Sequence, residues 1–256
     1  MKIVWLSANK LGYKLLIEAS KITDIEAIIT LSDKATTIMY DGISKKQWYG
    51  FEYSDIKVIE IERLNEEKEL LKELKPDLVI MCGWRQIIDK EILDIPSKGF
   101  IGFHPTLLPK GRGPAPIINS IMSGYKKSGL TMFYVAEGLD NGDIIAQEEF
   151  NIEDIDHASE VYEKVIDAGR KLVREQLPKL IEGTANRKPQ DDTKATFFVK
   201  PSLKNNKIDL QKESIDKIYN KIRALSYPYK GAYLEKDGKR LRIWKASLEE
   251  VNENGK

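Results

Sequence analysis

Two side chains that can carry protons stand near the middle of the chain. His104 ends the short apolar run GFIGFH at residues 99–104, and Asp140 lies in the stretch GLDNGD at residues 138–143. An imidazole takes up and releases protons near neutral pH, and a carboxylate can orient an imidazole or accept the proton of an attacking amine. Acyl transfer to an amine needs such groups, because the amine loses a proton, the tetrahedral oxyanion needs a donor and the leaving nitrogen gains a proton.

The residues around this pair form a longer pattern, with HPTLLP at 104–109, Arg112-Gly113 next, and GLDNGD at 138–143. The pattern resembles the formyltetrahydrofolate-dependent formyltransferases, the group that contains methionyl-tRNA formyltransferase, phosphoribosylglycinamide formyltransferase and the amino-sugar N-formyltransferases. By this resemblance His104 and Asp140 are catalytic, and 10-formyltetrahydrofolate is the formyl donor. Either residue alone fits a structural role, in a backbone hydrogen bond or a turn. The extended pattern favours the catalytic interpretation.

The resemblance also assigns binding residues. It places the folate after a buried strand and against the loop of Asp140, and it places the acceptor against the loop that follows His104. The folate residues are Trp84, Arg85, Gln86, Ile87, Asp140, Asn141 and Asp143, and the acceptor residues are Thr106, Lys110, Arg112 and Gly113. In the family Arg112 helps to shape the catalytic loop, which favours a structural role beside the site.

The chain departs from the family at one catalytic position, where Gly102 replaces an asparagine. An oxyanion that loses a donor costs on the order of 10²–10³ in rate. We expect the missing side chain to leave room for ordered water or for another donor, and the candidates are Asn9, Arg85, Gln86 and Asn119. The alternative is that Gly102 lets Phe103 or the substrate pack closely, while protonated His104 acts as the donor.

Short apolar runs alternate with amphipathic stretches, which predicts an α/β fold with a doubly wound, mostly parallel sheet. In such a sheet, sites collect at the carboxyl ends of the strands. Strands are predicted at 2–7, 26–31, 57–61, 77–83, 99–104 and 129–135, and helices at 14–21, 65–74, 115–123, 157–181 and 214–225. Pro178 is expected to end or kink the fourth helix, and His157 to act locally near its N-terminus.

Two units are predicted, a formyltransferase catalytic domain at 1–190 and a small β-rich subdomain at 191–256. Residues 182–194 have the composition of a linker. A strand pair at 232–246 that turns at Asp237-Gly238 resembles a short form of the barrel-like C-terminal subdomain of the family.

Composition narrows the range of partners. The chain has 41 basic and 40 acidic side chains, a net charge of +1, so no overall field attracts nucleic acid. No run is long and apolar enough to span a membrane, which predicts a cytoplasmic protein, and no spacing of ligands suggests a metal. The single cysteine, Cys82, fits a buried apolar position better than a nucleophile.

The segment Trp84-Arg85-Gln86 resembles the amino-sugar branch of the family. We therefore predict formyl transfer to the primary amine of a nucleotide-linked dideoxy amino sugar of surface-glycan biosynthesis. The GFHPT stretch also resembles the formyltransferases of the pseudaminic acid pathway and the formylation domains of peptide synthetases, and a homodimer is an open possibility. The alternatives are methionyl-tRNA formylation and a non-catalytic folate- or sugar-binding module, although binding alone would not need His104 and Asp140.

Overall fold

The computed structural model describes residues 1–36, 41–50, 56–200 and 206–251. Its main body is a seven-stranded sheet with the strand order β3-β2-β1-β4-β5-β6-β7. The strands are β1 (Ile3–Ser7), β2 (Ala27–Leu31), β3 (Lys57–Ile61), β4 (Leu78–Cys82), β5 (Phe100–His104), β6 (Lys127–Tyr134) and β7 (Ile144–Asn151). The first five pair in parallel, and β6 and β7 are antiparallel. The predicted α/β fold with a mostly parallel sheet is confirmed.

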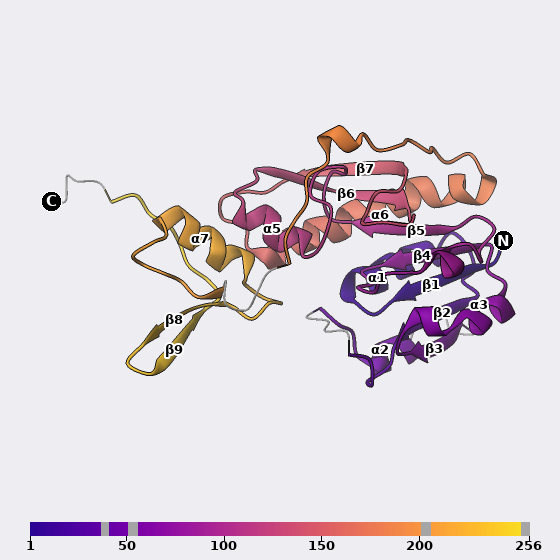
Figure 1. Ribbon diagram of the computed structural model, residues 1–256, viewed down its shortest axis with the longest axis horizontal. Helices are drawn as coiled ribbons and strands as arrows, with labels where there is room; N and C mark the ends of the chain where they lie inside the picture. The colour runs from indigo at the N-terminus through magenta and orange to yellow at the C-terminus, as the bar shows by residue number, and fades with distance from the viewer. Residues whose placement is uncertain (37–40, 51–55, 201–205, 252–256) are drawn as a thin grey trace.

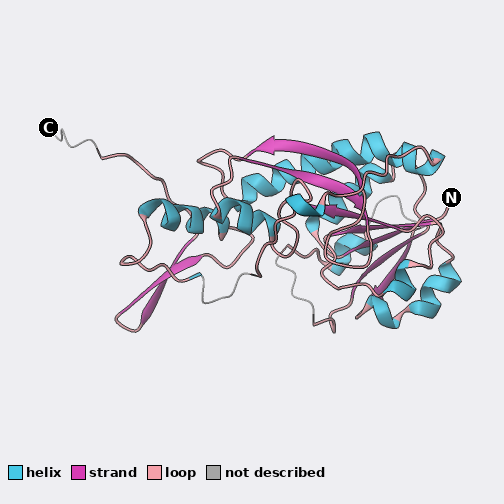
Figure 2. Ribbon diagram, turned by 45° about the horizontal axis from the view of Figure 1, so that its top comes forward, coloured by secondary structure: helices cyan, strands magenta, loops and turns pink. Residues whose placement is uncertain are grey.

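Helices cover both faces of the sheet (Figures 1 and 2). On one face lie α1 (Lys10–Ala19), α5 (Pro116–Met122) and α6 (Ala158–Glu182), and on the other lie α3 (Lys68–Leu74) and α4 (Lys90–Leu93). Strands buried on both sides read as continuous apolar runs, and all five residues of β1 are buried. Because successive side chains of a strand alternate between the faces, Phe103 enters the core under α6, whereas Gly102 and His104 face the opposite side.

The C-terminal part of the chain lies beside α5 and extends away from the sheet (Figure 1). It contains α7 (Ile215–Ala224) and a hairpin of β8 (Ala232–Lys236) and β9 (Lys239–Ile243). The hairpin turns at Asp237 and Gly238, both in the left-handed region, as the sequence predicts.

Several local features differ from the prediction. The edge strand β7 and the short helices α2 (Lys45–Tyr49) and α4 were not predicted. Pro178 does not end α6, because Leu177 and Leu180 on either side of it stay buried in the core. His157 is the N-cap residue of α6, as expected. In the ranges that the structure describes, no helix is long and apolar enough to cross a membrane.

Candidate active site

His104 lies at the carboxyl end of β5 and is buried. Its Nε2 is 2.7 Å from the carbonyl oxygen of Gly111. Because a carbonyl can only accept a hydrogen bond, Nε2 carries the hydrogen. Nδ1 is therefore the ring atom that can gain or lose a proton, and it lies 3.6 Å from Oδ2 of Asp140.

Asp140 reaches His104 from the far end of β5. Since β6 is antiparallel to β5, the loop after β6 starts beside Ile101 and folds back along the sheet. Asp140 itself has a left-handed backbone, with φ of 49°, which is uncommon for a residue with a side chain. Its Oδ2 also accepts a hydrogen bond of 2.9 Å from the backbone N–H of Gly113. The HPTLLP loop and the GLDNGD loop thus meet at one carboxylate oxygen.

Two polar side chains from the antiparallel strands hold the loop after His104 in place. Thr131 Oγ1 on β6 donates to the carbonyl of Thr106 at 2.6 Å and accepts from the N–H of Leu108 at 3.1 Å. Gln147 on β7 donates to the carbonyl of Leu108 at 2.9 Å and to Thr131 Oγ1 at 2.8 Å. Neither residue could be predicted from the sequence, because both act through strand pairing that the local pattern does not reveal.

The empty space expected beside Gly102 is not present. Gly102 pairs with Phe133 across the sheet, and a Cβ at residue 102 would lie 2.9 Å from Cε1 of Phe133 and 3.0 Å from Cγ2 of Val135. These apolar side chains fill the place where an asparagine would stand. The prediction of room for water was therefore wrong. The side chains that pack closely are those of Phe133 and Val135, and not that of Phe103, which the alternative named.

The four candidate substitute donors are all engaged elsewhere. Asn9 caps α1 by accepting from the N–H of Gly12 and donates to Asp41, and Arg85 pairs with Asp41 at 3.3 Å. Gln86 accepts from the N–H of Leu64 and donates to the carbonyl of Glu62, at the far side of the sheet. Asn119 donates to carbonyls at the start of its own helix and to that of Val199. These hydrogen bonds give no support to a substitute donor among the four side chains, and the donor stays a prediction.

The other predicted folate residues lie around two neighbouring loops. Trp84 is buried in the core cluster that also contains Ile88, whereas Ile87 is 84% exposed. Val135, at the start of the Asp140 loop, packs against the same cluster. In that loop Asn141 donates to the carbonyl of Glu137, and Asp143 pairs with Arg187.

The predicted acceptor residues divide into two groups. Lys110 is exposed, and Gly113 contributes its N–H to Asp140. Thr106 is buried, with its hydroxyl 3.5 Å from the carbonyl of Gly111. Arg112 is also buried, with its guanidinium bound to Gln190 and Asp192. Arg112 therefore supports the loop, as its alternative interpretation held, and does not present its charge to an acceptor.

Metal binding and catalysis by a cysteine find little support among the described residues. In the described ranges no group of three His, Cys, Asp or Glu side chains could hold a metal ion. Cys82 is fully buried at the end of β4, and burial raises the pKa of its thiol. A thiol that resists ionisation is a poor nucleophile, so Cys82 packs as a small apolar side chain.

Introducing the family's asparagine tests the packing around Gly102. We expect Gly102→Asn to lower the free energy of unfolding by about 1–3 kcal/mol, the usual cost of overpacking a filled core. Denaturant unfolding of this variant and of Gly102→Ala measures the cost. A fully stable Gly102→Asn protein would show that the space can open and would contradict this description of the site.

Comparison with known proteins places the chain in a family. Residues 1–177 match the family model for formyl transferases, and residues 202–256 match the model for the formyl transferase C-terminal domain. The chain belongs to the formyl transferase family. A curated relative, the methionyl-tRNA formyltransferase of Lysinibacillus sphaericus (strain C3-41), is 40% identical over 193 residues, which are 75% of this chain and 61% of that protein. The chain thus spans less than two thirds of the length of this relative.

Solved structures with different acceptors share the fold. A 4-N formyltransferase of Francisella tularensis has a TM-score of 0.75 at 22% identity and is matched over 98% of both chains. An N-formyltransferase of Helicobacter canadensis, in complex with folinic acid and dTDP-3-aminofucose, has a TM-score of 0.70 at 21% identity over 93% of this chain and 85% of that one. The methionyl-tRNA formyltransferase of Clostridium thermocellum has a TM-score of 0.67 at 22% identity, over 97% and 94%.

Proposed function

We propose that this protein transfers the formyl group of 10-formyltetrahydrofolate to the primary amine of a nucleotide-linked amino sugar. The observation that carries the formyl transfer is the pair of His104 Nδ1, which is buried, and Asp140 Oδ2, which is half-buried, 3.6 Å apart at the end of β5, in a chain of the formyl transferase family. This separation is longer than a direct hydrogen bond. Both groups therefore keep capacity to interact with a substrate atom.

We place the folate donor on the surface between the two loops beside this pair. Ile87 and Leu139 leave apolar side chains exposed there, and a flat heterocycle is bound by such apolar surface with a few polar groups. Within the described residues, the buried Nε1 of Trp84 has no hydrogen-bond partner. Residues 84–87 and 139–143 would hold the cofactor.

When bound, 10-formyltetrahydrofolate would supply the formyl carbon. The amine nitrogen forms a bond to this carbon, and the bond between the carbon and N10 breaks. The amine loses one proton and N10 gains one, so the step balances. Asp140 Oδ2 is placed to accept the proton from the amine, while the N–H of Gly113 fixes this oxygen. His104 keeps Nε2 bound to the carbonyl oxygen of Gly111, which leaves Nδ1 as the ring atom to which we assign the donated hydrogen. With Gly102 inside the sheet and its neighbours apolar, the Nδ1–H of His104 is the donor we assign to the oxyanion. We also assign to His104 Nδ1 the proton that N10 gains when its bond to the formyl carbon breaks.

A cleft at the same edge of the sheet is where we place the rest of the acceptor. It has a volume of about 280 Å³ and opens beside the end of β1, two strands from β5. Its walls come from α1, residues 41–43, the start of α6 and the C-terminal part of the chain, and include Lys14, Tyr162 and Tyr227. Tyr227 is 74% exposed. Aromatic faces and ammonium groups suit a base or sugar ring that carries phosphate.

Side chains rather than the start of α1 would bind the phosphates in this cleft. The first N–H groups of α1 already have partners, since Lys10 N–H donates to Asp41, Leu11 N–H to the hydroxyl of Tyr162 and Gly12 N–H to Asn9. A helix N-terminus binds an anion through unpaired N–H groups, and these are not available. Lys14 is the lysine of the cleft best placed for the role, because Lys10 is paired with Glu163.

A small acceptor is favoured over transfer RNA by charge and by the cleft. Binding of transfer RNA depends on neutralising phosphates with basic side chains, and the chain carries a net charge of +1. The Helicobacter canadensis enzyme of the same fold was crystallised with a dTDP-linked amino sugar. The curated relatives keep methionyl-tRNA formylation as the second candidate. Within the sugar class, the pseudaminic acid pathway is the finer assignment we propose, on the resemblance of residues 102–106.

Variants of the cleft test this placement of the acceptor. We expect Lys14→Ala to raise the KM for a nucleotide-linked amino sugar about 10–100-fold, the equivalent of one lost charged hydrogen bond. Tyr227→Ala should raise it by up to about 10-fold through lost ring contact. Steady-state kinetics should show an unchanged KM for 10-formyltetrahydrofolate, and Lys239→Ala on the exposed hairpin serves as the matched control. Equal rises in both KM values would contradict an acceptor site in this cleft.

A further inference from the structure

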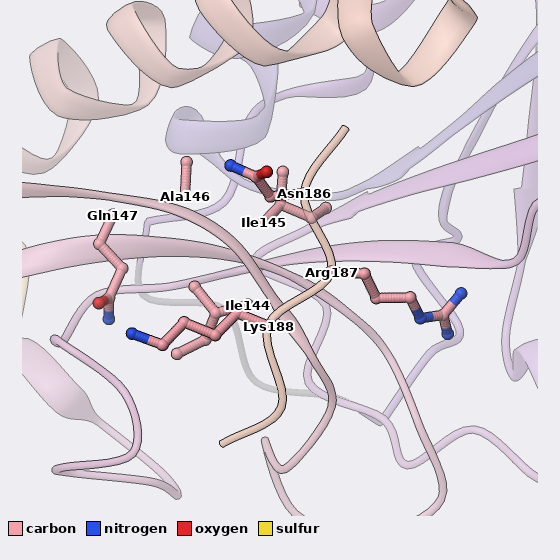
Figure 3. Close-up of a pocket in the computed structure, with 7 residues that line it drawn as sticks. All are labelled: Ile144, Ile145, Ala146, Gln147, Asn186, Arg187 and Lys188. Carbon is pink, nitrogen blue, oxygen red and sulfur yellow. The ribbon is translucent and has the colours of Figure 1, made fainter. Parts of the chain in front are cut away.

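The segment that follows α6 lies along the loop that carries Asp140, although its composition resembles a linker. The backbones of Lys188 and Ile144 exchange two hydrogen bonds, of 2.7 and 2.9 Å. Arg187 donates to the carboxylate of Asp143 at 2.9 Å and stacks over the ring of Tyr134. Figure 3 shows residues 186–188 passing beside the start of β7, with Arg187 pointing away from Gln147. The segment is thus fixed to the end of the loop.

Gln190 extends these contacts to Asp140 itself. Its Nε2 donates to the carbonyl of Asp140 at 2.9 Å and to the carbonyl of Gly142 at 2.7 Å. Its Oε1 accepts from Nε and Nη2 of Arg112, at 3.1 and 2.8 Å. Only an amide side chain offers two donors and an acceptor in this arrangement. One side chain therefore joins the loop after His104 to the loop of Asp140.

The backbone of Asp140 depends on such support. A non-glycine residue in the left-handed region persists where its surroundings hold it there, and Asp140 has φ of 49°. Two residues further on, a Cβ at Gly142 would lie 1.7 Å from the carbonyl oxygen of Tyr134, so the loop turns tightly against β6. The amide of Gln190 bonds the carbonyls on both sides of this turn.

We propose that Gln190 is a positioning residue for formyl transfer, which rests on the proposed function. It sets the Asp140 carboxylate against Nδ1 of His104 and the N–H of Gly113, and it does so through the backbone without contacting the substrate. Arg112 is buried and donates to Oε1 of Gln190, which keeps the amide of Gln190 in this orientation.

The substitution Gln190→Glu separates positioning from simple stability. A carboxylate still accepts from Arg112 and pairs with its charge, so we expect the protein to stay folded at the assay temperature. The donors to Asp140 and Gly142 are lost, and a negative oxygen faces two carbonyls instead. We expect kcat to fall on the order of 10²-fold, the effect of a misplacement near 1 Å, with KM unchanged for both substrates.

Amide hydrogen exchange at Gly113 gives a readout that needs no activity. Its N–H is bound by Asp140 Oδ2, so exchange should accelerate in Gln190→Glu while the amides of β4 and β5 stay protected. Gln211→Glu, the same change at an exposed residue, should leave both readouts unaltered. If Gln190→Glu does not fold, Gln190→Met, which removes the donors and keeps the volume, is measured in the same way.

The outcomes are distinct. Wild-type kcat, or unchanged exchange at Gly113 in a folded variant, would overturn the positioning role. A loss of kcat that merely follows a loss of melting temperature would assign Gln190 to stability alone and would also overturn it. If the wild type formylates no acceptor, the proposed function fails, while exchange at Gly113 still decides whether Gln190 positions Asp140.

Discussion

Replacing His104 with glutamine should lower kcat about 10²–10⁴-fold, the usual cost of losing a group that transfers protons. Glutamine can still donate to the carbonyl of Gly111, as Nε2 of His104 does at 2.7 Å. It has no atom that gains and loses a proton where Nδ1 lies. The loss therefore reports on Nδ1 and not on the packing of the loop.

Both steady-state kinetics and thermal unfolding should be measured on the His104→Gln variant. The melting temperature should stay near that of the wild type, because the buried hydrogen bond is retained. His157→Gln is the matched control, since His157 also contacts a carbonyl, that of Ile155 at 3.0 Å, but lies at the start of α6. Near-normal turnover in folded His104→Gln would remove the imidazole from the mechanism.

Asp140→Asn should cause a loss of similar size, about 10²–10⁴-fold in kcat. Asparagine tolerates the left-handed backbone, so the turn at φ of 49° is kept. The side-chain oxygen can still accept from the N–H of Gly113, whereas the negative charge that receives a proton from the amine is gone. Alanine would confuse this result, because it would also strain the backbone.

The chain provides a close control for this variant. Asp237 in the hairpin turn also has a left-handed backbone, with φ of 52°, and Asp237→Asn makes the same change far from the site. It should leave kcat unaltered. Retained activity in Asp140→Asn would show that the carboxylate is not the proton acceptor and would leave His104 to act alone.

Much of the fold could be predicted from the chain because the parallel strands are buried on both faces. Their apolar runs stand out in the sequence, and β1 and β4 lie within one or two residues of the predicted limits. The edge strand β7 was missed because its outer half alternates half-buried and exposed residues and includes two charged side chains, Glu148 and Glu149. The sequence of such a strand predicts it only weakly unless the strand that it pairs with is known.

The candidate site was predictable only where residues follow one another in the chain. The motif around His104 and the loop of Asp140 could be read directly, and the structure brings them together. The surroundings of Gly102 could not, because the side chain of Phe133 reaches it across the sheet from β6. The same limit concealed Gln190, whose bonds to Asp140 cross 50 residues of sequence.

Arg112 illustrates how burial changes the meaning of a motif residue. An arginine in an exposed loop of glycines and prolines would be expected to bind an anion. In the structure its side chain is 5% exposed and is bound by Gln190 and Asp192. Its charge is thereby satisfied within the protein, which is why we propose Lys14 of the cleft for phosphate binding.

The most direct measurement follows the formyl carbon itself. The wild-type protein is incubated with 10-formyltetrahydrofolate labelled in the formyl group, together with dTDP- and UDP-linked amino sugars or with methionyl-tRNA, and the products are identified by mass spectrometry. We predict that the label appears on the amine of a nucleotide-linked amino sugar, and that Asp140→Asn abolishes most of this transfer. Label on methionyl-tRNA and on none of the sugars would contradict the assignment of the acceptor.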